Sequence, residues 1–170
     1  MLRAIVFAAS VQAALQPGAP AREASQRPPT AGVLADARLE GTFIALSVAD
    51  AAASARWYEE TLGFRVVKRI DPPNEDVHIV IMEGAGAILE IVQHPRAKAR
   101  SAWHPDAKEA LDVRGIFKAG FRVVALDRVL QRLRDKGVEI RNGPFEVPEL
   151  QLRSFIAVDP DGNLLQFFGR

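Results

Sequence analysis

The chain has 170 residues, of which 48% are hydrophobic and 25% are charged. This length and composition are typical of one globular domain with a hydrophobic core of its own. The formal net charge of +1 gives no sign of a nucleic acid or a membrane surface as partner. The absence of cysteine excludes disulfides, thiolate nucleophiles and cysteine-bound zinc.

The N-terminal segment has the outline of a secretory signal peptide. A short basic start, Met1–Arg3, precedes an apolar run from Ala4 to Leu15 that two polar residues interrupt. Small residues suitable for cleavage follow, and the run is too short to span a bilayer. We therefore expect residues 1–21 to be a signal peptide, residues 22–40 a polar linker, and the mature protein to be periplasmic or secreted. A disordered tail or a wrongly chosen start codon would give the same pattern.

The stretch from residue 42 to residue 67 predicts a strand, a helix and a second strand. Phe43–Val48 alternates its side chains between two faces, as a β-strand does. Asp50 is placed to cap a helix, and Ala51–Leu62 are mostly good helix formers. Gly63 then stands where a helix ends in a left-handed residue.

The second half of the domain repeats the first. Three pairs of segments match at offsets of 74 to 76 residues: Gly86–Val92 with Gly162–Phe168, Leu62–Phe64 with Lys136–Val138, and Phe43–Val48 with Lys118–Val123. Such a duplication indicates two copies of one structural unit. We expect module one at about 42–92 and module two at about 117–169, joined by a polar connecting segment at 93–116.

Each module is predicted to contain one helix and four strands. The expected strands lie near 42–48, 64–70, 77–83 and 86–92 in module one, and near 117–124, 138–145, 151–158 and 163–169 in module two. The expected helices lie near 51–62 and 127–136, and Asp159–Gly162 has the composition of a hairpin turn. One further short helix is expected around 106–111 in the connecting segment.

The sequence resembles the vicinal oxygen chelate (VOC) superfamily over residues 42–169. The resemblance rests on SVAD and WYEETLGF within 47–64, DKGVEI at 135–140 and DPDGNLLQFF at 159–168. This superfamily groups glyoxalase I, extradiol dioxygenases, methylmalonyl-CoA epimerase and the bleomycin and fosfomycin resistance proteins. The resemblance implies an α+β fold over residues 41–170, in which two paired βαβββ modules form one cleft. It leaves the function open, because one fold hosts many chemistries.

Relatives that bind a metal place one ligand on the first and one on the fourth strand of each module. The resemblance assigns these four positions to Phe43, Glu90, Lys118 and Gln166. Only Glu90 is an ordinary ligand, because Phe43 cannot coordinate, Lys118 is cationic and an amide is a poor donor. We therefore expect no metal or other cofactor. A divalent metal would need an unorthodox site, for which Glu90 and His78 are the remaining candidates if the strand face of His78 is the cleft; His78 without a ligand is the simpler interpretation.

Charged side chains are predicted to take the place of the metal. We expect the Lys118 ammonium to pair with Glu90 and to be hydrogen-bonded by Gln166. Arg122, four residues further along the same strand, should face the same cleft. Two interpretations remain open: a structural ion pair that fills a former metal site, or two cations that hold an anionic or carbonyl-bearing ligand.

Aromatic side chains could line the same cleft. By strand alternation we place Phe43, Phe155 and Phe168 on the cleft, where they could form an apolar wall for a flat ligand. Trp57 and Tyr58 fall on the apolar stripe of the first helix and are assigned to the core.

The leading functional hypothesis is metal-independent binding of a small organic molecule in the cleft, as in the bleomycin resistance proteins. The first alternative is an enzyme, a lyase, isomerase or dioxygenase, that uses an unorthodox metal site or Lys118 as acid or nucleophile. The second alternative is a non-catalytic module that serves only in assembly. The expected partner is a small molecule, with no nucleic acid and no membrane, and homodimers are common among the proteins that the chain resembles.

Overall fold

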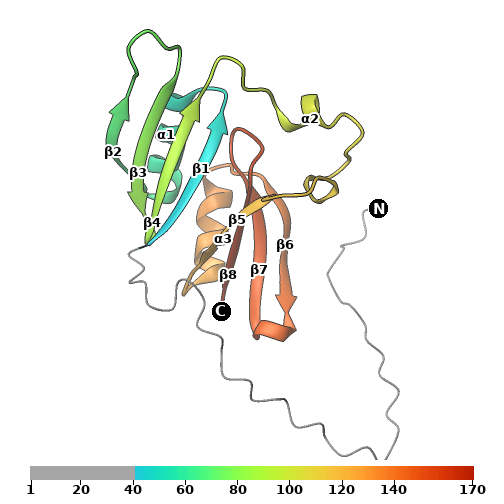
Figure 1. Cartoon of the computed structure of the whole chain (residues 1–170). Coiled ribbons are helices and arrows are strands. Elements are labelled where there is room, and N and C mark those ends of the chain that lie inside the picture. Colours follow the sequence, from blue (N-terminus) through green and yellow to red (C-terminus); the bar gives the residue numbers. More distant parts are fainter. Residues whose placement is uncertain (1–40) are drawn as a thin grey trace, which may run out of the picture. The chain divides into compact units, whose positions relative to one another are not determined.

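The computed structural model describes residues 41–170, which form two four-stranded sheets (Figure 1). The predicted signal peptide and linker lie outside the described residues. The elements follow in the order β1 (Thr42–Val48), α1 (Ala51–Trp57), η1 (Tyr58–Leu62), β2 (Arg65–Ile70), β3 (His78–Gly84), β4 (Ala87–Gln93), α2 (Arg100–Trp103), η2 (Ala110–Asp112), β5 (Lys118–Arg122), α3 (Leu126–Asp135), β6 (Ile140–Val147), η3 (Pro148–Leu150), β7 (Leu152–Val158) and β8 (Leu164–Gly169). No helix of this part of the chain is long and apolar enough to cross a membrane.

Both sheets have the same topology, which confirms the predicted fold of two βαβββ modules. The strand order is β1-β4-β3-β2 in the first sheet and β5-β8-β7-β6 in the second. In each sheet the first strand of the module runs parallel to the fourth, and the remaining pairs are antiparallel. The helix of each module, α1 or α3, follows its first strand.

The predicted helix at 51–62 changes its winding halfway. The Asp50 carboxylate caps α1 by accepting a 2.8 Å hydrogen bond from the amide of Ala53. The following turn, Tyr58–Leu62, is a wider π-helix and ends at Gly63, whose φ is 76°. Glycine is favoured here because a side chain would be strained in this left-handed conformation.

The helix expected around 106–111 is wrong in position. The connecting segment instead carries α2 before this range and the single turn η2 at its end. Pro105 disfavours helical geometry at His104, which has φ −134° and ψ 69° and ends α2. The Asp112 carboxylate fixes the later turn, because it accepts hydrogen bonds of 2.9 Å from the amides of Lys108 and Glu109.

One side of each sheet packs against the helix of its module. Strand alternation directs every second side chain to this side. The buried residues form one continuous hydrophobic core that spans both modules and includes Val48, Tyr58, Phe64, Met82, Leu89, Ile91, Leu126, Leu130, Leu133, Phe155, Leu165 and Phe167. Side chains of the opposite alternation phase point away from the helices and form two faces that are open in part.

Two carboxylates of the β7–β8 turn connect the modules. Asp159 accepts a 2.8 Å hydrogen bond from the hydroxyl of Tyr58. Asp161 accepts one of 2.8 Å from the hydroxyl of Ser54 and one of 2.7 Å from the amide of Ala49. Burial and the neighbouring Asp159 carboxylate raise the pKa of Tyr58 far above its ordinary range, so that its hydroxyl remains a donor. The predicted hairpin turn is therefore also the junction between the modules.

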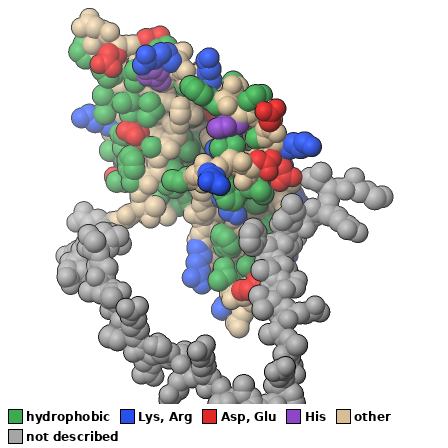
Figure 2. Space-filling view, turned by 45° about the vertical axis from the view of Figure 1, so that its right-hand side comes forward, with side chains coloured by type: hydrophobic (Ala, Val, Ile, Leu, Met, Phe, Trp, Pro, Cys, Tyr) green, Lys and Arg blue, Asp and Glu red, His purple; other side chains and the backbone are tan. Residues whose placement is uncertain are grey.

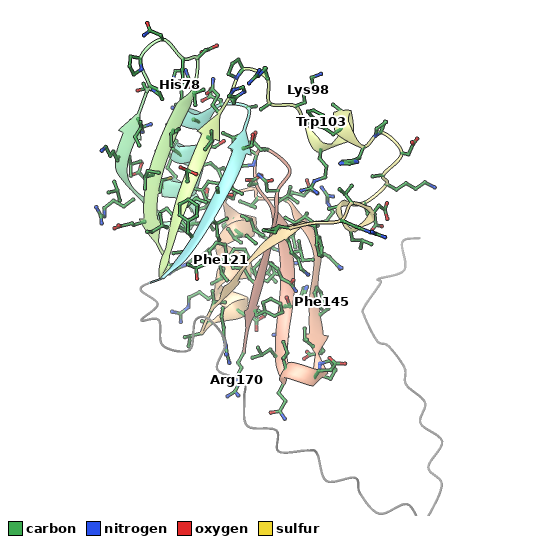
Figure 3. The ribbon with its side chains drawn as sticks, viewed as in Figure 1. His78, Lys98, Trp103, Phe121, Phe145 and Arg170 are labelled. Carbon is green, nitrogen blue, oxygen red and sulfur yellow. The ribbon has the colours of Figure 1, made fainter. Side chains whose placement is uncertain are left out.

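Aromatic contacts support the same junction from inside the core. Phe121 of β5 lies close to where the two sheets meet (Figure 3). Its ring meets that of Phe64 nearly edge-on, with 6.2 Å between centroids, and stacks on that of Phe167 at 5.5 Å. Aromatic pairs at these distances add to the free energy gained by burial.

Removing the donors of this junction should destabilise the fold. We expect Tyr58→Phe and Ser54→Ala each to lower the free energy of unfolding by about 1–3 kcal/mol, because each leaves a carboxylate oxygen of the turn with one donor fewer. Urea denaturation measures the change. Ser101→Ala removes a hydroxyl from an exposed position of α2 and should have no measurable effect; equal stabilities of all three variants would contradict the role of the turn.

Candidate functional site

The first open face is the side of the first sheet that points away from α1. Its members are Phe43, Ala45 and Ser47 on β1, Ile79 and Ile81 on β3, and Ile88, Glu90 and Val92 on β4. Glu90 lies at the centre, between Ala45 and Ile81 on the neighbouring strands. The surrounding surface is apolar, with Phe43 59% and Ile88 38% exposed, and Figure 2 shows hydrophobic side chains spread over the surface of the first module. Apolar surface of this kind is typical of an interaction site.

The second open face is the side of the second sheet that points away from α3. Its members are Lys118, Gly120 and Arg122 on β5, Ser154 and Ile156 on β7, and Leu164, Gln166 and Phe168 on β8. Gly120 and Arg122 are exposed, whereas Ser154 and Gln166 are buried. This face therefore combines the exposed Arg122 and the partly buried Lys118 with buried polar side chains.

Gln166 has an unsatisfied acceptor although it is only 4% exposed. Its Nε2 donates a 2.8 Å hydrogen bond to Oγ of Ser154, which in turn donates to the carbonyl of Phe167 at 2.9 Å. Its Oε1 receives no hydrogen bond within residues 41–170. Leaving a buried carbonyl oxygen without a hydrogen-bond donor costs free energy. A donor from another molecule that reached this oxygen would recover that free energy.

The predicted ion pair between Lys118 and Glu90 is not formed. Neither residue takes part in an ion pair within the described residues. Gln166, which was predicted to hydrogen-bond Lys118, donates a hydrogen bond to Ser154 instead. Nζ of Lys118 lies 5.0 Å from the centroid of the Phe117 ring. Partial burial lowers the pKa of Lys118, because desolvation disfavours its charged form. Lys118 and Glu90 lie on different sheets, so strand register alone could not bring them together.

The aromatic residues predicted for the cleft lie on different sides of the sheets. Phe43 lies on the first open face. Phe168 lies on the second open face, on the same side as the exposed Arg122. Phe155 is instead fully buried on the helix side, where its ring stacks on Phe167 with 4.9 Å between centroids. The antiparallel register pairs Phe155 directly with Phe167 and so gives both the same side. This part of the prediction is wrong.

The fold does not bring Glu90 and His78, the candidates for an unorthodox metal site, to the same side of the sheet. His78 pairs with Gln93 and shares the helix side of its strand with Val80, whereas Glu90 points to the open face. No set of three His, Asp or Glu side chains within residues 41–170 is arranged to hold a metal ion. The four inherited ligand positions do not fit a metal either, because one is a phenylalanine and one a lysine.

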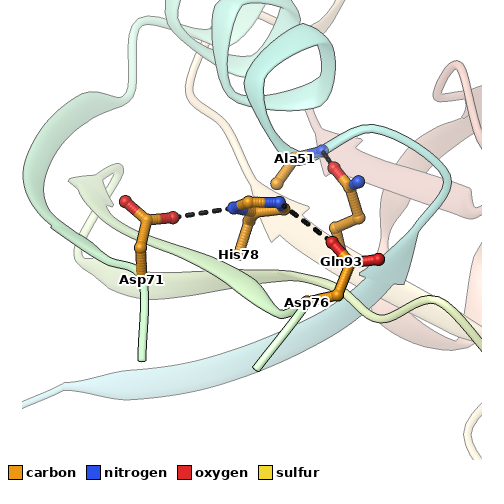
Figure 4. A network of polar contacts seen from close by, with 5 residues as sticks. All are labelled: Ala51, Asp71, Asp76, His78 and Gln93. Carbon is orange, nitrogen blue, oxygen red and sulfur yellow. Dashed lines mark hydrogen bonds and ion pairs between the residues drawn. The ribbon is translucent and has the colours of Figure 1, made fainter. Parts of the chain in front are cut away.

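His78 belongs to a separate polar network that sequence reasoning did not find. Its Nδ1 lies 2.7 Å from Asp71, and its Nε2 lies 3.7 Å from Asp76 (Figure 4). The hydrogen bond with Asp71, followed by the charges of Asp71, Asp76 and Asp50, raises the pKa of His78. The sequence feature that could have predicted this network is the close spacing of acidic residues in Asp71–Asp76, shortly before His78. A cavity of about 280 Å³ adjoins this network, at the start of α1.

Two cavities of the described domain lie outside the centres of the open faces. The first, beside His78, is lined by Asp50, Ala51, Ala52, Arg69, Asp71, His78, Ile79, Val80 and Gln93. The second, of about 380 Å³, lies in the connecting segment between Trp103 and Val113, and Trp103 itself is on α2 (Figure 3).

The paired βαβββ modules define the class of fold to which this domain belongs. A family model, that of the Glyoxalase/Bleomycin resistance protein/Dioxygenase superfamily, matches residues 42–167. The chain belongs to this superfamily. Comparison with curated protein sequences gives no significant match.

Solved structures of this superfamily share the fold at low sequence identity. A glyoxalase family protein from Enterococcus faecalis is 23% identical with a TM-score of 0.58, covering 78% of this chain and 98% of that one. TnmS3, an antibiotic-binding protein from a Streptomyces species, is 23% identical with a TM-score of 0.56, covering 78% and 97%. A glyoxalase I variant from Zea mays is 18% identical with a TM-score of 0.60, covering 77% of this chain and 45% of that one.

The His78–Asp71 pair predicts a pH-dependent contribution to stability. Because the folded state raises the pKa of His78 above its ordinary 6.5, the contribution is fully present below pH 6.5 and is lost as the pH rises through the raised pKa. An NMR titration of the His78 ring should show a midpoint above 6.5 that Asp71→Asn lowers. Asp135→Asn, on α3, should leave it unchanged, and an ordinary midpoint in the native chain would refute the pairing.

Proposed function

We propose that this protein binds a small, flat organic molecule on its open sheet faces without using a metal. The observation that carries this proposal is the content of the four inherited ligand positions, Phe43, Glu90, Lys118 and Gln166, which retain their places on the faces but not the chemistry of a metal site. Apolar and cationic groups stand there instead. An antibiotic-binding protein among the structures of the same fold supports a binding role by analogy.

The first open face supplies the apolar part of the proposed site. Burying apolar surface contributes about 25 cal/mol per Å², and the exposed rings and branched chains around Phe43 and Ile88 offer such surface without prior rearrangement. Glu90 in their midst adds a polar group that can orient a ligand. The second open face supplies the cations and the free acceptor of Gln166.

The enzymatic alternative depends on Lys118. An unorthodox metal site with His78 is no longer available to it, because His78 and Glu90 lie on opposite sides of the sheet. A desolvated lysine, by contrast, is neutral in a larger fraction of molecules at a given pH, and the neutral amine is the form that attacks carbonyl compounds.

We also propose that the mature protein is exported. This proposal rests on the sequence of residues 1–21 alone.

Removing the aromatic ring of Phe43 should weaken the binding of a flat apolar probe. With naphthol as the probe, we expect Phe43→Ser to raise the dissociation constant about tenfold, since it removes a ring that contributes about 1–2 kcal/mol of contact. NMR titration of backbone amides measures the affinity and shows where the probe lies. Leu150→Ser is the matched control, because Leu150 is 57% exposed and lies on η3, away from both open faces.

The Phe43→Ser variant, measured also by light scattering, distinguishes ligand binding from a role in assembly alone. A second copy of the chain could cover the first open face, as the assembly alternative requires. Light scattering would then show a dimer, Phe43→Ser would change the measured mass, and naphthol would shift no amides of the open faces. That combination of results would overturn the proposed binding function.

Metal content tests the metal-independent part of the proposal. Because the four positions supply only one ordinary ligand, we expect no stoichiometric Fe, Mn, Ni or Zn in protein purified without chelators or an affinity tag, even after soaking. Inductively coupled plasma mass spectrometry makes the measurement. One metal ion per chain that Glu90→Gln removes would show that the proposed site is a metal centre after all.

A further inference from the structure

The second open face presents two cations on one strand. Lys118 and Arg122 lie on the same side of β5, four residues apart, with Gly120 between them. At a rise of about 3.3 Å per residue their Cα atoms are about 13 Å apart. Neither forms an ion pair within residues 41–170. Because both side chains are long, either can reach an acidic group on a ligand that lies over Gly120.

Gly120 leaves the strand surface bare between these cations. It is exposed and is absent from the described glycines with positive φ, so backbone conformation does not require glycine here. A Cβ at this position would meet only the carbonyl oxygen of Gln166 at 3.6 Å and the ring of Phe168 at 3.8 Å, which are ordinary van der Waals distances. Glycine weakens the interior of a strand and often marks a place where another group approaches the backbone.

Phe168 and Gln166 border the bare surface. The distance of 3.8 Å places Cε2 of Phe168 where it would contact a flat group resting on Gly120. Gln166 is the direct neighbour of Gly120 on β8, and its buried Oε1 receives no hydrogen bond from the described residues.

The position of Lys118 favours an acidic ligand. The Phe117 ring on one side of its ammonium, at 5.0 Å, restricts where that ammonium can lie. Its partial burial means that the charge has lost water without gaining an acid. A carboxylate would restore this interaction as a charge-assisted hydrogen bond, which is stronger than one between neutral groups.

We propose that Gly120 is the floor of a site for a planar aromatic ligand that carries a carboxylate or another acidic oxygen. The ring lies on Gly120 against Phe168, and the acid contacts Lys118 or Arg122. This inference rests on the proposed binding function and deepens it by naming the class of ligand and the residue that admits it.

Three probes with the same ring system separate charge from shape. Naphthoate is anionic, naphthamide is its neutral counterpart, and naphthylmethylammonium is cationic. In NMR titrations of the full-length chain we expect naphthoate to bind about tenfold more tightly than naphthamide, the gain of one charge-assisted hydrogen bond. The cation should bind most weakly, and the shifted amides should lie on β5 and β8.

Substitutions on β5 test the placement of the ligand. Gly120→Leu should abolish the shifts of the β5 and β8 amides with all three probes and leave any binding around Phe43 unchanged. The melting temperature should not fall, because a Cβ at this exposed position meets no atom closer than 3.6 Å. Lys118→Met and Arg122→Met should each reduce the preference for naphthoate and leave the affinity for naphthamide unchanged. Lys98→Met, in the connecting segment (Figure 3), is the matched control and should change neither affinity. If Gly120→Leu disturbs the fold, Gly120→Ala provides a smaller block, with a partial loss expected.

The outcomes distinguish this inference from the function on which it rests. Equal affinities for naphthoate and naphthamide, with shifts on the open faces, would overturn the ligand class and leave the binding function standing. Probe-induced shifts of the β5 and β8 amides that survive Gly120→Leu in a folded chain would overturn the placement on β5. If no probe shifts amides of either open face at millimolar concentration, both the inference and the binding function are wrong.

Discussion

The arrangement of the two modules depends on the carboxylates of one turn. Asp159 is 4% exposed, and a buried charge is tolerated only when it is fully hydrogen-bonded. Besides Tyr58, its donors are the amides of Asp161 and Asn163 and the Asn163 side chain. The turn is thus held rigid from within the second module while it anchors the first, and the direction in which the open faces point follows from this anchor.

The helix sides of both sheets form the common core. Substitutions on the opposite sides therefore change the chemistry of the surface without disturbing this core. The positions that hold metal ligands in relatives lie on these free sides, so their side chains contribute little to the core. Phe43 and Lys118 at these positions are therefore compatible with the fold, and they contribute to an apolar face and a cationic face. Ligand binding without a metal is the use of these faces that we propose.

Local patterns were sufficient for the fold but only partly for the site. The Asp50 cap and Gly63 reflect interactions within a few residues, the duplication is read directly from the sequence, and all three appear in the structure as expected. The assignment of Phe155 to the cleft failed because alternation defines two sides of β7 without saying which is buried. The pairing of Lys118 with Glu90 failed because it required a contact between strands of different sheets, which no local pattern specifies.

The sequence by itself determined that the chain consists of two βαβββ modules, because the duplication and the residue patterns within each copy need only residue types and their spacing. The four ligand positions are implied by the resemblance to the superfamily. The tertiary structure alone decided which side of each sheet faces its helix, that His78 joins Asp71 instead of Glu90, and that Gly120 stands bare between two cations. The reason is physical: the side of a strand that becomes buried is fixed by the packing of helices and modules far apart in the chain, and not by the strand itself.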